Sequence, residues 1–234
     1  MNKGVVIKID NVWKKYDMGD ADPLIVLRGI NLEIKKGEFV SITGPSGSGK
    51  STMMNIVGAL DIPSWGDVLL KEKNISNMSE SELSILRGKT IGFIFQRFNL
   101  LSTMSALKNV MLPMEMIDID EAEAKERATE LLTALGLGDR LNHKPTELSG
   151  GQQQRVAIAR ALSNNPEMIL ADEPTGNLDS KTGRFVMSYL EKLNREGKTI
   201  VLITHDTDLV HYAQRIIYIL DGKIEKEVKN GKKK

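Results

Sequence analysis

The chain has 234 residues, enough for one large α/β domain or for a core domain that contains an inserted subdomain. It has no cysteine, which excludes a disulfide framework, thiolate metal sites and cysteine nucleophiles. Its 32 basic and 31 acidic residues leave a net charge of +1, so no global electrostatic field favours nucleic acid or a membrane surface as a partner. Catalysis must therefore rest on carboxylates, His, Lys, hydroxyl groups or a bound ion.

Neither a membrane span nor a signal peptide is indicated. No stretch reaches the roughly 18 consecutive apolar residues that a spanning helix needs, and the N-terminal MNKGVVIKID lacks a long apolar run. We therefore expect a cytosolic protein. The basic end KIEKEVKNGKKK has two interpretations, a solvated and frayed terminus, which we favour, and a patch that binds lipid or nucleic acid.

The first half of the chain begins with short β-prone segments. Val5–Ile9 and Leu32–Ile34 predict antiparallel edge strands, and a turn-rich stretch with Gly19 and Pro23 separates them. EFVSITG, at 38–44, has the pattern of a buried strand, and the helical run STMMNIVGAL follows it closely. This order predicts a strand, a loop and a helix.

The second half repeats the order of helix and apolar strand. Met168–Glu173 and Thr199–Thr204 are buried-strand patterns that each follow a helical segment. The final pair, RIIYIL and KIEKEV, is joined by Asp221-Gly222 and predicts a hairpin. Strands that alternate with helices predict a mostly parallel sheet with helices on its faces.

The middle of the chain breaks this order, because about 76–141 carries mainly helical periodicity. Within Glu121–Leu135, for example, apolar residues recur at helical spacing. The predicted fold class is thus α/β, with a mostly parallel sheet, an N-terminal antiparallel β subdomain and an inserted helical subdomain. We expect a single domain whose core spans about 1–95 and 160–234, with the helical subdomain at about 96–159.

A glycine-rich loop lies between the strand at 38–44 and the helix after it. GPSGSGKST, Gly44–Thr52, contains a glycine, four residues, then glycine, lysine and a hydroxyl residue. Such a backbone turns N–H groups towards a phosphate at a helix N-terminus, and Lys50 would reach the β- and γ-phosphates while Ser51 binds magnesium. An ordinary glycine-rich turn is the alternative, which the flanking strand and helix disfavour. The motif predicts a P-loop that binds a nucleoside triphosphate.

Two carboxylates end the apolar run that starts at Met168. Asp172 can hold magnesium directly or through water, and Glu173 follows at the carboxyl edge of the predicted sheet. A second carboxylate beside a magnesium ligand suits the polarisation of an attacking water. The alternative is that Glu173 merely starts the next loop or caps it. Beside the P-loop we favour a catalytic role.

Two further polar residues end β-prone runs. His205, in VLITHD, lies at a strand terminus where it could contact a γ-phosphate, whereas His143 and His211 do not, and a structural role stays open for all three. Gln96, in IGFIFQRFNLL, has an amide that could contact magnesium or the attacking water. By itself Gln96 is a weak signal.

A second glycine-rich helix start occurs about a hundred residues after the first, in LSGGQQQRVAIARAL. Ser149 can bind phosphate or cap the helix, and Gly150 and Gly151 present backbone N–H groups. A well-capped helix would explain the same residues. Because this loop has no lysine and no magnesium ligand, we interpret it as half of a nucleotide site.

Taken together, these motifs resemble the ATP-binding subunit of an ABC transporter over essentially the whole chain. GPSGSGKST matches Walker A, LSGGQ the signature, MILADE Walker B, and GNLDS the D-loop. The resemblance implies a head-to-tail homodimer in which two ATP molecules are sandwiched between the Walker A of one copy and the signature of the other. The resemblance also implies that membrane permease subunits are partners and that nucleic acid is not a partner.

The resemblance also implies a role for each matching residue. Lys50, Ser51, Asp172 and Gln96 would serve the phosphates and Mg²⁺ bound by the same copy, Glu173 would be the base, and His205 would contact the γ-phosphate. The implied ATP-binding set is Tyr16, Gly44, Pro45, Ser46, Gly47, Ser48, Gly49, Lys50, Ser51 and Thr52 in one copy, with Ser149, Gly150, Gly151, Gln152 and Asp179 from the other.

Two of these positions carry an open question. Tyr16 matches the aromatic residue that stacks on adenine, although it could also be a partly exposed strand-end Tyr. Asn177, in GNLDS, departs from the Ala or Ser of many relatives, which puts the packing of the D-loop in doubt but not Asp179.

The finer resemblance is to ATPases of lipoprotein release and macrolide-type export. It implies ATP hydrolysis that drives permease movement at the inner face of the cell membrane. The docking surface is expected just after Gln96, including Met104–Met116, where methionines suit an adaptable groove or equally an irregular core. An ATPase of a membrane signalling or cell-division complex is the main alternative. ATPases of DNA repair and chromosome organisation would need a coiled-coil insertion, and those of translation usually carry two cassettes.

Overall fold

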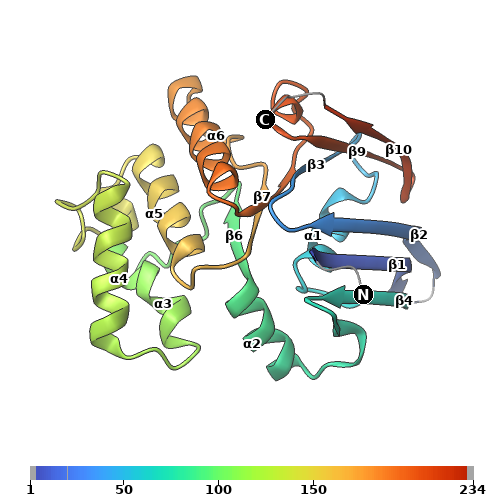
Figure 1. Ribbon diagram of the computed structural model, residues 1–234, viewed down its shortest axis with the longest axis horizontal. Coiled ribbons are helices and arrows are strands. Elements are labelled where there is room, and N and C mark those ends of the chain that lie inside the picture. The colour runs from blue at the N-terminus through green and yellow to red at the C-terminus, as the bar shows by residue number, and fades with distance from the viewer. Residues whose placement is uncertain (1–3, 20, 231–234) are drawn as a thin grey trace. The chain divides into compact units, whose positions relative to one another are not determined.

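The computed structural model describes residues 4–19 and 21–230 (Figure 1). They form two compact units, which are treated separately below. The first unit comprises Met1–Ser84 with Leu190–Lys234, and the second comprises Ile85–Tyr189. The helices α2, Glu80–Thr90, and α6, Ser180–Arg195, run across the boundaries. The predicted ATP-binding core at about 1–95 and 160–234 is defined by its role in binding ATP rather than by packing. That assignment stays a prediction.

An antiparallel sheet opens the first unit. Its strand order is β2-β1-β4-β5, with bounds β1 Val5–Met18, β2 Ala21–Lys35, β4 Trp65–Leu70 and β5 Lys73–Asn74. The register pairs Ile9 with Leu32, as an antiparallel arrangement of the two predicted segments requires. The expectation that both are edge strands was wrong, because β4 pairs with the other side of β1. A short 3₁₀ turn follows at Ile75–Asn77.

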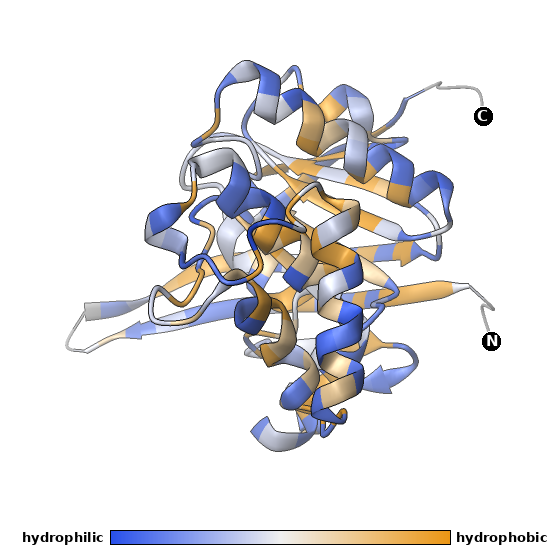
Figure 2. Ribbon diagram, turned by 90° about the vertical axis from the view of Figure 1, so that its left-hand side faces the viewer, coloured by the Kyte–Doolittle hydropathy of each residue, from blue (hydrophilic) through white to orange (hydrophobic). Residues whose placement is uncertain are grey.

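The second sheet region of this unit has the order β10-β9-β3-β8. Its members are β3 Phe39–Thr43, β8 Thr199–Ile203, β9 Arg215–Leu220 and β10 Lys223–Lys229. β3 is parallel to both β8 and β9, and every residue of β3 and β8 is buried. Because both faces of these strands are buried, their sequences are continuously apolar. Strands of this kind are coloured mainly hydrophobic in Figure 2. Helix α1, Lys50–Val57, follows β3, and a 3₁₀ turn lies at Val210–Tyr212.

The predicted C-terminal hairpin is confirmed. β9 and β10 are antiparallel, and Lys223 pairs with Leu220 across the turn. Asp221 and Gly222 have φ values of 48° and 77°, the left-handed conformations of a tight two-residue hairpin turn. Lys223–Lys229 is thus an ordered strand rather than a frayed end, whereas 231–234 lie outside the described residues.

The second unit combines two parallel strands with helices. β6 Ile91–Phe95 and β7 Met168–Asp172 pair in parallel. The helices α3 Ala106–Glu115, α4 Glu121–Ala134 and α5 Gly150–Leu162 pack against one another, and a 3₁₀ turn at Pro145–Glu147 precedes α5. The predicted helix at 121–135 is confirmed, since all five of its apolar positions are buried, namely Ala124, Ala128, Leu131, Leu132 and Leu135.

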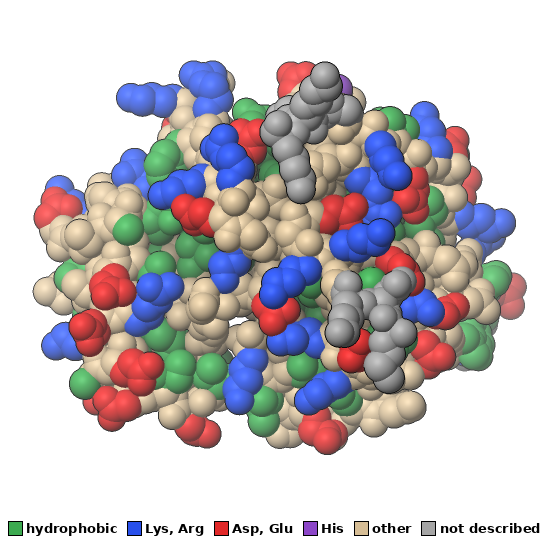
Figure 3. Space-filling view, viewed as in Figure 1, with side chains coloured by type: hydrophobic (Ala, Val, Ile, Leu, Met, Phe, Trp, Pro, Cys, Tyr) green, Lys and Arg blue, Asp and Glu red, His purple; other side chains and the backbone are tan. Residues whose placement is uncertain are grey.

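The methionine-bearing segment serves mainly as core. Met111 and Met114 are 4% and 1% exposed in α3, whereas Met116 is 72% exposed. The core-packing interpretation therefore applies to the two buried side chains. Among the described residues, no helix is long and apolar enough to cross a bilayer. Charges of both signs are interspersed over the face shown in Figure 3, as the net charge of +1 suggests.

Candidate functional site

The loop between β3 and α1 is held close to neighbouring backbone. Gly44 follows β3, and a side chain at its position would overlap the carbonyl oxygen of Ile219 in β9. The main-chain N–H of Gly222 donates to the carbonyl of Ser48 at 3.1 Å. Only a residue without a Cβ fits at position 44. The glycine-rich sequence is thus required for the path of this loop.

The same loop presents polar groups that suit an anion. Lys50 begins α1 and its Nζ donates to the carbonyls of Gly44 and Pro45, at 2.8 and 2.7 Å, which folds the ammonium over the loop. The Ser48 Oγ is buried and has no hydrogen-bond partner among the described residues. An ammonium, an unsatisfied hydroxyl and a helix N-terminus without an acidic residue in its first turn together favour bound phosphate.

His205 follows the strand beside β3. Ile203, the last residue of β8, pairs with Ile42, and the N–H of Thr204 donates to the Ile42 carbonyl at 3.2 Å. The carboxyl ends of β3 and β8 therefore lie at one edge, where His205 is exposed. This is the edge at which open parallel sheets bind ligands.

Tyr16 lies near the end of β1 and is partly exposed. Its hydroxyl donates to the Asp61 carboxylate at 3.2 Å, and the Lys14 ammonium lies 5.1 Å from its ring centroid. Lys14 also forms an ion pair with Asp61 at 2.6 Å. These contacts fix the ring, and its stacking on adenine stays a prediction.

In the second unit, Gln96 and Glu173 also follow neighbouring parallel strands. Phe95 of β6 pairs with Asp172 of β7, so the two residues come next at the same strand edge. Glu173 has a φ of 44°, a left-handed conformation that is strained for a residue with a side chain. Such strain persists where surrounding contacts hold it, and it is common at functional sites.

The D-loop is joined to the segment after β6. The Asn177 Nδ2 donates to the main-chain carbonyl of Gln96 at 3.0 Å. A Cβ at Gly176 would lie 2.6 Å from the Gln96 Nε2, so a side chain there would displace the Gln96 amide. The unusual Asn177 therefore has a defined contact, which answers the question that its departure raised about local packing.

Sequence reasoning missed Arg160, which holds the next residues of the same segment. Its guanidinium donates to the carbonyls of Asn99 at 2.5 Å and Phe98 at 2.8 Å. Burial lowers the pKa of Arg160 from its ordinary value. The sequence signal was weak, because RVAIARAL contains two arginines, Arg155 and Arg160, and its pattern does not distinguish them.

The second glycine-rich start is a reciprocally capped helix. The Ser149 Oγ accepts from the Gln152 N–H at 3.3 Å, and the Ser149 N–H donates to the Gln152 Oε1 at 2.9 Å. Ser149 and Gly150 are exposed. This capping box leaves the Ser149 hydroxyl hydrogen available to a ligand. Both interpretations of the motif, cap and half-site, are therefore compatible with the same residues.

Asp179 precedes α6. Its carboxylate accepts from the N–H groups of Lys181 and Thr182 and, at 2.6 Å, from the Thr182 hydroxyl. The Thr182 hydroxyl, with these N–H groups, lowers the pKa of the exposed Asp179 carboxyl. Asp179 is thus ionised and fixed at a helix N-terminus.

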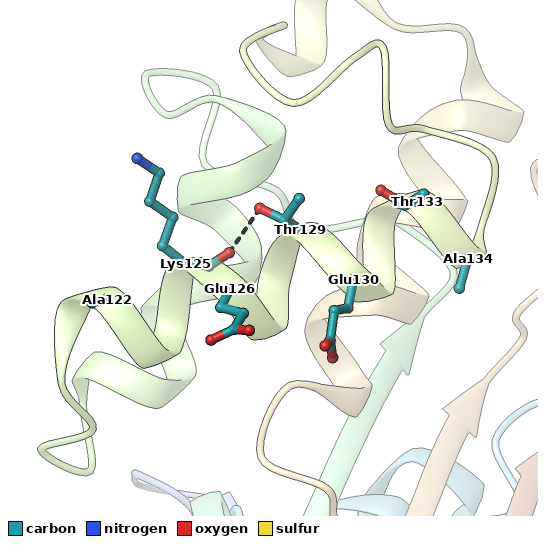
Figure 4. Close-up of a pocket in the computed structure, with 7 residues that line it drawn as sticks. All are labelled: Ala122, Lys125, Glu126, Thr129, Glu130, Thr133 and Ala134. Atoms are coloured by element: carbon teal, nitrogen blue, oxygen red, sulfur yellow. Dashed lines mark hydrogen bonds between the residues drawn. The ribbon is translucent and has the colours of Figure 1, made fainter.

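The second unit has hollows on its surface. One, of about 770 Å³, lies along the face of α4 that carries Lys125, Glu126 and Thr129 (Figure 4), and it contains none of the motif residues. Another, of about 380 Å³, lies directly after Gln96 and is lined by Arg97, Phe98, Asn99, Leu100, Pro145 and Asn177.

The chain carries oxygen donors of the kind that Mg²⁺ prefers. The described residues contain no cluster of three or more His, Cys, Asp or Glu that would hold a metal on its own. Mg²⁺ is instead usually bound by one or two carboxylates together with phosphate oxygens and water. The exposed Ser51 hydroxyl of the first unit, and the Asp172 carboxylate and Gln96 amide of the second, are donors of this kind.

Comparison with known proteins decides the family. The family model for ABC transporters matches residues 27–176, which includes the P-loop, the signature and the end of β7. The chain belongs to the ABC transporter family. The glycine-rich loop at Gly44–Thr52 and the helix start at Ser149 therefore belong to an ABC transporter cassette.

Similar proteins cover nearly all of the cassette. It is 56% identical to an uncharacterized ABC transporter ATP-binding protein, MJ1508, of Methanocaldococcus jannaschii, over 94% of the chain and 97% of that protein. It is 52% identical to the macrolide export ATP-binding/permease protein MacB of Bartonella quintana, over 94% of the chain but 33% of that longer protein.

A solved structure confirms the fold. The ATP-binding cassette MJ0796, also found in M. jannaschii, matches with a TM-score of 0.88 and 50% identity over 96% of the chain and 98% of that protein. That structure is described as a dimer in a post-hydrolysis state, bound to ADP and phosphate. The predicted α/β P-loop fold is thus confirmed.

Proposed function

We propose that this cassette is the ATP-binding and ATP-hydrolysing subunit of an ABC transporter and works as a head-to-tail dimer with two ATP molecules in its interface. The observation that carries the proposal is the presence of two unlike helix starts. The P-loop has Lys50 and an unsatisfied Ser48 hydroxyl, whereas the start at Ser149 has neither a lysine nor a magnesium ligand. We infer that the second start of one copy completes the first start of another copy.

Each copy would bind the phosphates mainly through its P-loop. Lys50 donates to the β- and γ-phosphates once its bonds to Gly44 and Pro45 are exchanged for phosphate oxygens. Ser51, Asp172 and Gln96 would hold Mg²⁺, which would neutralise phosphate charge. His205 contacts the γ-phosphate.

Glu173 would act as the general base for water. The strained backbone of Glu173, just after β7, would fix the direction in which its side chain leaves the main chain. That direction matters because much of the catalysis of phosphoryl transfer comes from positioning the attacking water. Across the dimer, Ser149, Gly150, Gly151 and Gln152 would bind the partner's γ-phosphate, with Asp179 beside them. ADP lacks that phosphate, so hydrolysis would weaken the closed dimer. The two copies would then move apart.

The opening motion would be passed to membrane permease subunits, which place the cassette at the inner face of the membrane. Support comes from MacB, whose name joins an ATP-binding part with a permease. The hollow beside Phe98 and Leu100 suits a partner segment, because it lies on the residues that directly follow Gln96. Exposed Leu101 and Met116 extend the apolar surface of the same unit.

Export, or the handling of lipoproteins or peptides, is the favoured process. The similarity to MacB favours it over an ATPase that serves a membrane signalling or cell-division complex. The two can be separated by measuring ATP hydrolysis with the permease encoded beside the cassette. Stimulation by a transported compound supports transport, whereas stimulation by the permease alone, with no compound moved, supports the alternative.

The dimer is tested with Glu173→Gln, which preserves the side-chain shape but removes the base. We expect hydrolysis to fall by about a hundredfold or more, and the protein to elute as a dimer with ATP and as a monomer without it. Glu126→Gln, on the exposed face of α4, is the matched control and should behave as the wild type. A Glu173→Gln protein that stays monomeric at saturating ATP contradicts the sandwich.

A further inference from the structure

A buried glutamine in α5 contacts the backbone directly after Glu173. Gln154 is 0% exposed, and its Nε2 donates to the Pro174 carbonyl at 2.8 Å. The orientation of the amide is fixed by chemistry, because a carbonyl accepts only from the nitrogen end. The bond therefore ties the helix that begins at the signature to the segment that carries the proposed base.

Stability alone does not explain this amide. The Gln154 Oε1 is buried and has no hydrogen-bond partner among the described residues. A buried polar atom without a partner is destabilising, and an apolar side chain of similar shape would avoid that cost only by leaving the buried Pro174 carbonyl without its donor. The amide therefore serves the one contact that it makes.

The contacted segment needs support. Glu173 combines a φ of 44° with a following proline, and a residue before proline is normally extended. Two hydrogen bonds hold consecutive carbonyls of this segment. The Gly176 N–H donates to the Glu173 carbonyl at 3.1 Å, and Gln154 donates to that of Pro174. Without the second bond, the segment would lose a restraint that helix α5 provides from outside its own turn.

We propose that Gln154 is a positioning residue for Glu173, which holds the strained backbone so that the carboxylate meets the attacking water. The inference rests on the proposed ATPase function. Gln154 would not touch ATP, so its loss should slow the chemical step and leave ATP binding unchanged.

The first test is Gln154→Met, which keeps an unbranched side chain of similar length and removes the donor. Its matched control is Asn164→Leu, because Asn164 also donates a side-chain amide to backbone carbonyls, those of Gly88 and Pro113, and also has a buried oxygen without a partner. We expect kcat of Gln154→Met to fall at least tenfold, with KM and the ATP-dependent dimer of the Glu173→Gln background changed less than twofold. Asn164→Leu should keep kcat within twofold at a similar loss of thermal stability.

A second variant, Gln154→Glu, tests the donor itself and also serves if the Met variant does not fold. Burial raises the pKa of a carboxyl, and the protonated form can donate its O–H to Pro174. We expect kcat, relative to the wild type, to be higher at pH 6 than at pH 8.5 and to exceed that of the Met variant at the lower pH.

Two results would overturn the positioning role. One is a kcat of Gln154→Met within twofold of the wild type or no lower than that of Asn164→Leu. The other is a Gln154→Glu protein that is inactive, or no faster than the Met variant, at every pH. A wild-type protein that hydrolyses no ATP would instead contradict the proposed function, so the two failures are distinguishable.

Discussion

The helices α1 and α5 both follow glycine-rich loops, but they begin in opposite ways. α1 follows Gly49, which offers no side chain as a cap, and its first residue is Lys50. α5 follows Ser149, whose hydroxyl and backbone are paired with Gln152 in a capping box. The first start has a lysine and a buried Ser48 hydroxyl without a partner among the described residues, whereas the second has a helix cap formed within its own chain. The comparison teaches that the two starts differ in kind, which supports the proposal that the first binds the phosphates and the second completes the site of another copy.

The largest expected effect comes from removing the lysine of the first start. Lys50→Ala should weaken ATP binding by about 10- to 100-fold, because charge-assisted hydrogen bonds contribute about 1.5–3 kcal/mol each. Equilibrium binding of ATP to the monomer measures this effect, and Lys181→Ala, at an exposed position of α6, should bind ATP as the wild type does. Unchanged ATP affinity would mean that α1 does not hold the phosphates.

Ser149→Asp separates the two roles of the second start. Aspartate caps helices as well as serine does, so thermal stability should stay within about 0.5 kcal/mol, while its charge repels a partner's phosphate. In the Glu173→Gln background we expect the ATP-dependent dimer to weaken about tenfold or more, with ATP binding to the monomer unchanged. Ser149→Ala is the complementary control, because it loses the cap, at about 1 kcal/mol, without adding charge. A Ser149→Asp protein that dimerises normally would reduce this start to a capped helix.

Asn177→Ala should have a smaller effect, because it removes one neutral hydrogen bond between the D-loop and the Gln96 carbonyl. Such a bond contributes about 1 kcal/mol, so we expect kcat to fall roughly fivefold at constant monomer affinity for ATP. Asn74→Ala, which loses side-chain amide contacts to Asp67 and to the Ser76 N–H in the first unit, is the control. A rate equal to that of the wild type would show that the contact does not support Gln96.

The smallest effect concerns pH. Because contacts with Thr182 lower the pKa of Asp179, its stabilising contribution is complete above the ordinary carboxyl pKa and is lost as the pH falls through the lowered value. Asp179→Asn should therefore reduce Tm at pH 7 and have little effect near pH 2. Thermal melts at both pH values measure it, and an equal loss at both would show that the carboxylate charge is not involved.

Local patterns predicted much of this fold because their determinants lie within a few residues. The loop at Gly44–Thr52, the helix at 121–135 and the turn at Asp221-Gly222 each follow from adjacent residue types. The pairing of β1 with β4 did not, because it joins residues such as Ile7 and Leu70 that are distant in the sequence.

Two parts of the second unit show the same limit. Helix α3 contains Pro113, which removes a backbone donor and obscures the helical pattern. The contacts of Asn177 with Gln96 and of Arg160 with Phe98 span 81 and 62 residues. Motif spacing predicted the chemical groups of the site, but not the side chains that hold their backbone, because those contacts depend on tertiary packing.

The central claim is that Ser149 of one copy completes the site of Lys50 in another. The most direct measurement mixes a Ser149→Arg protein with a Lys50→Ala protein, both in the Glu173→Gln background, and follows ATP-dependent dimerisation by size-exclusion chromatography. A dimer of either variant alone carries a defect in both of its ATP sites. The mixed dimer has one site with both changes and one site with neither. We expect ATP to produce a dimer in the mixture and only monomers in each protein alone. Monomers in the mixture at saturating ATP would contradict the claim.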